Sequence, residues 1–159
     1  MASNMISSIL PPTSQGYLPI WLWIVASTAL INGLVNLATP NAPSPSSKGK
    51  NATTKANPSH KVYSSPSGSL SSTPLTARLF GTWNILSALV RFACAYQPKN
   101  TPVYALCAAT FILALVHFGS EAALYGNIDV KKAGSASPFF VAGGSLVWMV
   151  AQAQWYAEA

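Results

Sequence analysis

Charged residues are scarce in this 159-residue chain, and their scarcity excludes an ordinary soluble domain. Only 8% of the residues are charged and 50% are hydrophobic, whereas a soluble domain carries about 25% charged residues. Two cysteines are too few for a disulfide framework, and they do not form a paired-cysteine metal motif. The first 16 residues contain no Lys or Arg, so the basic region of a secretory signal peptide is absent. We therefore expect the first apolar run to be retained.

Long apolar runs are what the chain has in abundance. Four of them approach or exceed the roughly 20 residues that a membrane-spanning helix needs. None shows the period-2 alternation of a barrel strand. We therefore expect an all-α membrane protein with four transmembrane helices in a small bundle. These helices are expected at residues 17–38, 76–96, 102–125 and 138–156.

The segments between the runs differ in length and composition. An N-terminal tail occupies residues 1–16. Residues 39–75 are rich in Ser, Pro, Lys and Asn, a composition typical of a disordered polar loop. Residues 97–101 contain Pro and Asn and predict a tight turn, which makes the second and third helices an antiparallel hairpin. Residues 126–137 form a basic loop.

Basic residues are concentrated in the first and third connections. They are Lys48, Lys50, Lys55, Lys61, Lys131 and Lys132. Because Lys and Arg near span ends are retained on the cytosolic face, we expect loops 39–75 and 126–137 to be cytosolic and both termini to be lumenal. The sequon Asn51-Ala52-Thr53 tests this orientation, since it would be glycosylated only in a lumenal loop. The net charge of +6 then reflects topology and attraction to anionic lipids, and nucleic acid is not an expected partner.

Ionisable side chains inside the apolar runs are costly, so each needs a structural or functional reason. The hairpin places Arg78 level with Glu121, and His117 shares the face of Glu121 because positions i and i+4 are neighbours on a helix. We therefore expect an Arg78–Glu121 ion pair with His117 hydrogen-bonded beside it. Arg91 is level with Cys107, where there is no acid, and is expected to snorkel to the far interface.

Small residues recur at the spacing that lets helices approach closely in lipid. They form Ala29-x-x-x-Gly33, Gly119-x-x-x-Ala123 and the patch at residues 142–145. Two interpretations stay open: packing inside the bundle, which is favoured, and contact with another chain.

No set of residues suited to catalysis or cofactor binding emerges. His117 and Glu121 have the spacing of a helical metal-ligand pair, but His60, the only other histidine, lies in the polar loop. A membrane di-iron oxygenase needs many more histidine ligands than these two. No GxGxxG motif follows a strand, and the loop serines lack a base. We expect no catalytic, metal or cofactor-binding site. A transporter is disfavoured because the runs show no inverted repeat.

The order of several short motifs resembles that of a known family. The motifs are Arg78-Leu-Phe-Gly-Thr-Trp-Asn with Arg91, then His117-Phe-x-Ser-Glu121 with Tyr125-Gly126, then Pro138 and Ser145-Leu-Val-Trp-Met149. Together they are similar to the ergosterol biosynthetic protein 28 family of fungi and animals. The resemblance covers about half of the chain, from Arg78 to Gln152, and we expect residues 17–37 to match the first span of the family.

The resemblance implies a small protein of the endoplasmic reticulum membrane that is a scaffold and not an enzyme. Its partners would be the sterol C-4 methyl oxidase, the sterol C-3 dehydrogenase/decarboxylase and the 3-keto sterol reductase. The alternative is a sterol-binding or sterol-passing protein with an intramembrane groove near Trp83, Asn84 and His117. Membrane lipids are expected partners in either case, and self-association is left open. The six residues selected as structural or interaction sites are Arg78, Trp83, Asn84, Arg91, His117 and Glu121.

Overall fold

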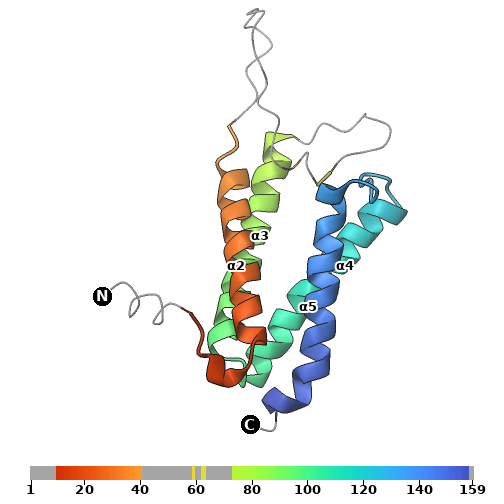
Figure 1. The fold of residues 1–159 in the computed structure, drawn as a ribbon. Helices are drawn as coiled ribbons and strands as arrows, with labels where there is room; N and C mark the ends of the chain where they lie inside the picture. Colours follow the sequence, from red (N-terminus) through yellow and green to blue (C-terminus); the bar gives the residue numbers. More distant parts are fainter. Residues whose placement is uncertain (1–9, 41–58, 60–61, 64–72, 158–159) are drawn as a thin grey trace, which may run out of the picture.

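Four long helices dominate the part of the chain that the structure describes (Figure 1). The computed structural model describes residues 10–40, 59, 62–63 and 73–157. Most of the predicted disordered loop, including Asn51 and His60, lies outside these residues. The elements are η1 (Thr13–Gln15), α2 (Leu18–Leu37), α3 (Pro74–Tyr96), α4 (Thr101–Ala123) and α5 (Ala133–Ala157).

Prolines and capping side chains set the beginnings of α3 and α4. Thr73 Oγ1 accepts a hydrogen bond from the Thr76 backbone N–H at 3.2 Å, and Asn100 Oδ1 accepts one from Val103 N–H at 3.2 Å. Both helices carry a proline in their first turn, where its missing N–H costs no intrahelical bond. The short connection between α3 and α4 therefore matches the hairpin turn expected from the sequence.

The last helix begins earlier than the sequence predicts. It starts at Ala133 and contains Pro138, the residue at which the apolar run begins. A proline inside a helix leaves the carbonyl four residues earlier without its backbone donor. Here that carbonyl belongs to Gly134, and the Ser137 hydroxyl donates to it at 3.1 Å. The adjacent serine thus supplies the hydrogen bond that the proline cannot make.

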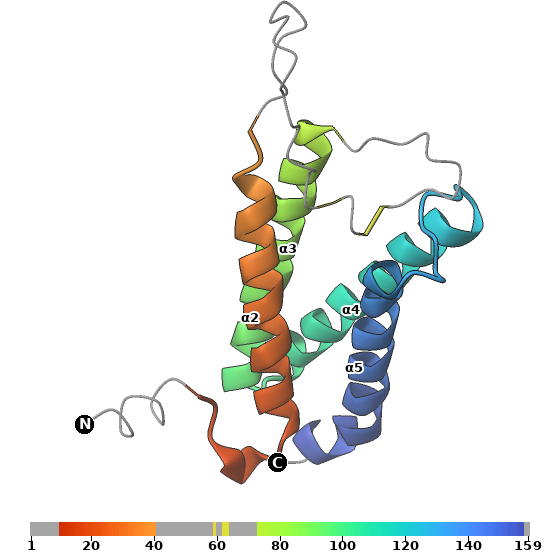
Figure 2. The ribbon, with the colours of Figure 1, turned by 45° about the horizontal axis from the view of Figure 1, so that its top comes forward.

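The helices are arranged as two pairs that meet near the α3–α4 turn and diverge toward the other end. The main packing partners are α2 with α3 and α4 with α5. Figures 1 and 2 show the two pairs approaching each other at the end where α2 begins and α5 ends. The divergence opens space between the pairs at the opposite end.

Two glycines allow α2 and α3 to cross at very short distance. A Cβ atom added to Gly81 would lie 2.7 Å from the Gly33 carbonyl oxygen and 2.7 Å from the Leu37 backbone nitrogen. A Cβ on Gly33 would lie 2.9 Å from the Gly81 carbonyl oxygen. The predicted packing role of Ala29-x-x-x-Gly33 is therefore confirmed, with Gly81 as its partner. By contrast, Gly119, Gly143 and Gly144 face open space within the described chain.

Side-chain hydrogen bonds join α5 to the other helices. Trp21 Nε1–H on α2 donates to Ser145 Oγ at 2.9 Å, and Tyr104 Oη–H on α4 donates to the Met149 carbonyl at 2.6 Å. Near the helix ends, Tyr156 Oη–H donates to the Gln15 carbonyl at 2.6 Å. These bonds fix α5 to both neighbours where the two pairs converge.

Three of the long helices have the length and apolar character needed to cross a membrane. They are α2, α4 and α5. The outer faces of these helices carry large exposed apolar side chains, among them Leu34, Leu113 and Val147, as expected for contact with lipid. The fourth helix, α3, is continuous but contains Arg78 and Arg91. It is not among the described helices that reach the hydropathy of a membrane span. The structure thus supports an all-helical membrane protein with three apolar spans.

Candidate interhelical groove

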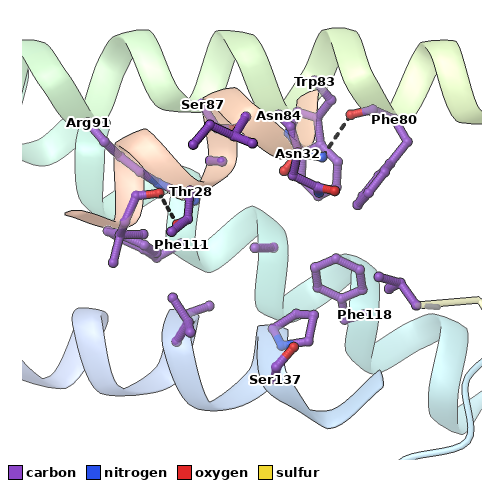
Figure 3. A pocket seen from close by; sticks show the side chains of 18 of the residues that line it. Thr28, Asn32, Phe80, Trp83, Asn84, Ser87, Arg91, Phe111, Phe118 and Ser137 are labelled. Atoms are coloured by element: carbon purple, nitrogen blue, oxygen red, sulfur yellow. Dashed lines mark hydrogen bonds between the residues drawn. The ribbon is translucent and has the colours of Figure 1, made fainter. Parts of the chain in front are cut away.

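The space between the two helix pairs forms an open groove of about 630 Å³. This volume falls within the range of roughly 300–1,000 Å³ typical of small-molecule sites. All four long helices contribute to its lining. Figure 3 shows Thr28 and Asn32 from α2, Trp83 and Arg91 from α3, and Ser137 from α5 around it.

Apolar side chains make up most of the groove wall, with a few polar groups between them. Phe111 and Phe118 on α4 and Val141 and Ala142 on α5 are among its apolar lining residues. Asn84 Nδ2–H donates to the Phe80 carbonyl at 2.8 Å. An apolar channel with separated polar groups suits an amphipathic ligand better than a fully polar one.

The predicted site residues Trp83, Asn84 and Arg91 all line this groove, and His117 lies beside it. The ring centroids of His117 and Trp83 are 5.2 Å apart, with their planes nearly perpendicular. Two of the three residues named for the expected groove, Trp83 and Asn84, are thus among its lining residues. The sequence does not indicate that α2 and α5 supply the other walls, because packing between distant helices leaves no local signal.

Arg91 does not reach the far interface, contrary to the snorkelling prediction. Its side chain is only 8% exposed. Nε–H donates to Thr110 Oγ1 at 3.2 Å, and the guanidinium carbon lies 4.1 Å from the centroid of the Phe111 ring. Stacking on an aromatic face is favourable for a guanidinium in a site of low polarity. The side chain therefore turns toward α4, as Figure 3 shows.

The predicted ion pair between Arg78 and Glu121 is not formed. Arg78 Nη1–H donates to the Thr39 carbonyl at 3.1 Å, whereas Glu121 Oε2 accepts a hydrogen bond from Asn127 Nδ2–H at 2.6 Å. Within the described residues the ion pair that occurs joins Lys132 to Asp129, at 3.8 Å. Equal depth along two helices does not bring side chains together when the helices diverge, as α3 and α4 do. The pairing prediction was wrong for that reason.

His117 instead bonds to a residue that the sequence did not mark. Tyr63, from the connection between α2 and α3, places its hydroxyl 2.7 Å from His117 Nε2. Burial raises the pKa of the Tyr63 hydroxyl above its ordinary value, and the negative charge of Glu121 raises it further. The hydroxyl therefore keeps its proton at neutral pH and can donate to the ring nitrogen. In the sequence, Tyr63 was distinguished only as a lone aromatic residue in a polar loop, which does not indicate a contact with His117.

Tyr63 belongs to an aromatic cluster at the wide end of the molecule. The centroid of its ring lies 5.5 Å from that of Phe80 and 6.4 Å from that of Phe118. Phe118 also contacts Phe139 on α5, at 6.2 Å. Edge-to-face and tilted aromatic pairs at such distances are stabilising. The cluster thus connects the loop to α3, α4 and α5 beside the groove.

We expect Tyr63→Phe to destabilise the protein modestly. The substitution keeps the ring contacts but removes the hydroxyl, and a lost hydrogen bond to a buried partner costs about 1 kcal/mol. The thermal unfolding midpoint in detergent should fall by a few degrees. Tyr125→Phe is the matched control, because Tyr125 is exposed. An equal shift in both variants would show that the bond to His117 contributes nothing.

Among the described residues, no three side chains of His, Cys, Asp or Glu come close enough together to hold a metal ion. Cys94 and Cys107 are buried free cysteines. The polar groups that line the groove include Asn84, Ser87 and Arg91.

Comparison with known proteins places this chain among relatives of similar length. A family model described as "Erg28 like protein" matches residues 18–147. "Ergosterol biosynthetic protein 28" of Candida albicans is 34% identical, and the match covers 94% of each chain. The protein of the same name from Schizosaccharomyces pombe is 32% identical, covering 92% of this chain and 93% of the relative.

More distant organisms share a shorter region. "Ergosterol biosynthetic protein 28 homolog" of Homo sapiens is 40% identical over 48% of this chain and 54% of the relative. No solved structure matches the chain significantly. The family match covers all of the groove-lining helices in whole or in large part. The resemblance found in the sequence is therefore confirmed, and the chain belongs to the Erg28 family.

Proposed function

We propose that this protein is a non-catalytic scaffold of sterol biosynthesis in the endoplasmic reticulum membrane. Its partners are the sterol C-4 methyl oxidase, the C-3 dehydrogenase/decarboxylase and the 3-keto reductase. The observation that carries the proposal is the family match over residues 18–147, together with relatives named for ergosterol biosynthesis. Holding sequential enzymes in one membrane patch raises the effective concentration of each for the product of the previous one.

The structure supports an adaptor in two respects. Its outer faces are apolar along α4 and α5, so neighbouring transmembrane helices can pack on them within the bilayer. Gly143 and Gly144 have open space around them in the described chain, and small residues at such places let another helix approach closely. Both features are compatible with protein partners in the membrane.

Affinity purification of the tagged full chain from detergent-solubilised membranes tests the scaffold. Mass spectrometry should recover all three enzymes well above their level with an equally tagged, unrelated protein of the same membrane. The purified chain alone should not turn over 4-methylsterols. Absence of all three enzymes at normal abundance of the tagged chain would refute the proposal.

We further propose that α3 crosses the membrane as a fourth span. Its 23 residues extend about 34 Å at 1.5 Å per residue, enough to cross a hydrocarbon core of about 30 Å. It also packs along α2, which is itself an apolar span, and the close contact between Gly81 and Gly33 lies within that span. Four crossings put both termini on one side.

The proposed orientation predicts that Asn51 carries no glycan. The loop holding it is rich in lysine and is therefore assigned to the cytosol. Treatment with an endoglycosidase should leave the mass of the membrane-inserted protein unchanged, and Asn51→Gln should have the same mass apart from the substitution itself. A mass loss on treatment that Asn51→Gln abolishes would reverse the orientation.

Sterol binding is the second candidate function, and the groove favours it. Its size and mostly apolar wall fit a small amphipathic molecule. Sterol that copurifies with the wild-type protein, measured by mass spectrometry of extracted lipids, would support this function. It is compatible with the scaffold, since a bound intermediate would stay near the enzymes.

A further inference from the structure

The groove contains a buried cation whose hydrogen-bonding capacity is only partly used. Arg91 has five N–H donors, and within the described residues one of them, on Nε, has a hydrogen-bond acceptor, Thr110. The side chain is 8% exposed and lines the groove. No Asp or Glu forms an ion pair with it in the described chain. A buried charge without a counter-charge is costly unless something else compensates it.

A second polar group lies one helical turn away. Ser87 lies four residues before Arg91, on the same face of α3. It is 6% exposed and lines the groove, and no hydrogen bond joins its hydroxyl to another described residue. A guanidinium presents parallel donors that fit a carboxylate in a two-point contact. The serine hydroxyl can hold one further oxygen beside it.

The rest of the groove is elongated and mostly apolar, and its other polar lining residues are Thr28, Asn32, Asn84 and Ser137. From Arg91 its lining continues along α3 through Asn84 and Trp83 to Phe80, with Phe111 and Phe118 opposite. Arg91 lies eleven positions after Phe80 on the helix, a rise of about 16 Å. Figure 3 shows Arg91 at one end of this row and Phe80 and Phe118 toward the other. Arg91 and Ser87 therefore lie toward one end of a mostly apolar groove, and Asn32, Asn84 and Ser137 line it nearer the other end.

We propose that the groove binds an amphipathic carboxylic acid, with the carboxylate on Arg91 and the apolar body extending toward Phe80 and Phe118. The identity of the acid rests on the proposed function: it is a 4-carboxysterol. A methyl oxidase that supplies a decarboxylase must pass on a carboxylic acid, because the carboxyl group is what leaves as carbon dioxide. In such a sterol the 3-hydroxyl is next to the carboxyl group, which matches the pair Arg91 and Ser87.

Direct binding to the purified full chain in detergent tests this proposal. The probes are a 4-carboxysterol, the corresponding neutral 4-methylsterol and oleic acid. We expect the sterol acid to bind roughly 10- to 100-fold more tightly than the neutral sterol, the range that hydrogen bonds to a charged group provide. Oleic acid, which has the carboxylate without the rigid body, should bind more weakly than the sterol acid. Equal affinities for the acid and the neutral sterol would overturn the proposal, and so would tighter binding of oleic acid.

Variants assign the effect to the guanidinium. Arg91→Gln should remove the preference for the acid, and binding of the neutral sterol by this variant reports an intact groove. Arg91→Lys should keep part of the preference, because it retains charge but not the two-point contact. Arg78→Gln on the same helix is the matched control, since Arg78 does not line the groove. A preference that survives Arg91→Gln would refute the assignment.

Failure of this inference is distinguishable from failure of the scaffold. Arg91→Gln should still copurify with the three enzymes, because the groove faces the interior between the helix pairs. Loss of acid binding with retained enzymes would separate the two roles. Absence of the enzymes from the wild-type protein would refute the scaffold whatever the groove binds.

Discussion

Gly81→Val should destabilise the helix pair α2–α3 strongly. A Cβ atom at this position would lie 2.7 Å from two backbone atoms of α2, and backbone atoms cannot rotate away as side chains do. The helices would have to separate along their whole crossing. Overpacking of a close interface costs about 1–3 kcal/mol, and we expect the upper end here. The thermal unfolding midpoint in detergent should fall clearly.

Gly144→Val is the matched control for this experiment. Gly144 lies within a long helix, as Gly81 does, but a Cβ there meets no atom within 4 Å. The control therefore contains the same change in helix propensity and apolar bulk without the clash. Gly33→Val, on the other side of the contact, should resemble Gly81→Val. Equal unfolding midpoints for Gly81→Val and Gly144→Val would show that the close crossing does not limit stability.

The helices could be predicted from the sequence because each is a local property. Runs of apolar residues near membrane length, bounded by Pro102 or by the turn around Lys99, define them without reference to the rest of the chain. The glycine at position 33 was also recognisable from its spacing to Ala29. Its partner Gly81 was not, because one glycine in another helix has no spacing pattern.

The interactions between helices were predicted less well. The depth of Arg78 and Glu121 follows from the hairpin, but their lateral separation depends on how far α3 and α4 diverge. α3 packs tightly on α2 through residues far apart in the sequence, so no local pattern indicates how far α3 lies from α4. Arg91 was misplaced for a related reason, since its acceptor Thr110 and its stacking partner Phe111 belong to the neighbouring helix.

Phe118→Ala should be the most destabilising single truncation in the aromatic cluster. The ring is 6% exposed and contacts rings from three helices and from the α2–α3 connection. Its neighbours are Tyr63, Phe80, Trp83, His117 and Phe139, with centroids 5.2–6.4 Å away. Removing a buried phenylalanine costs about 3–5 kcal/mol through lost contacts and the cavity that remains.

The control is Phe140→Ala on α5, which removes the same side chain from a position that is 79% exposed. In lipid an exposed phenylalanine has little packing to lose, so this variant should unfold near the wild-type temperature. Phe118→Leu should fall between the two, because it refills part of the cavity. Hydrophobic transfer alone cannot produce this difference in a membrane, where lipid tails are as apolar as the core. If both alanine variants lose stability equally, interhelical packing around Phe118 is not what holds the wide end of the bundle together.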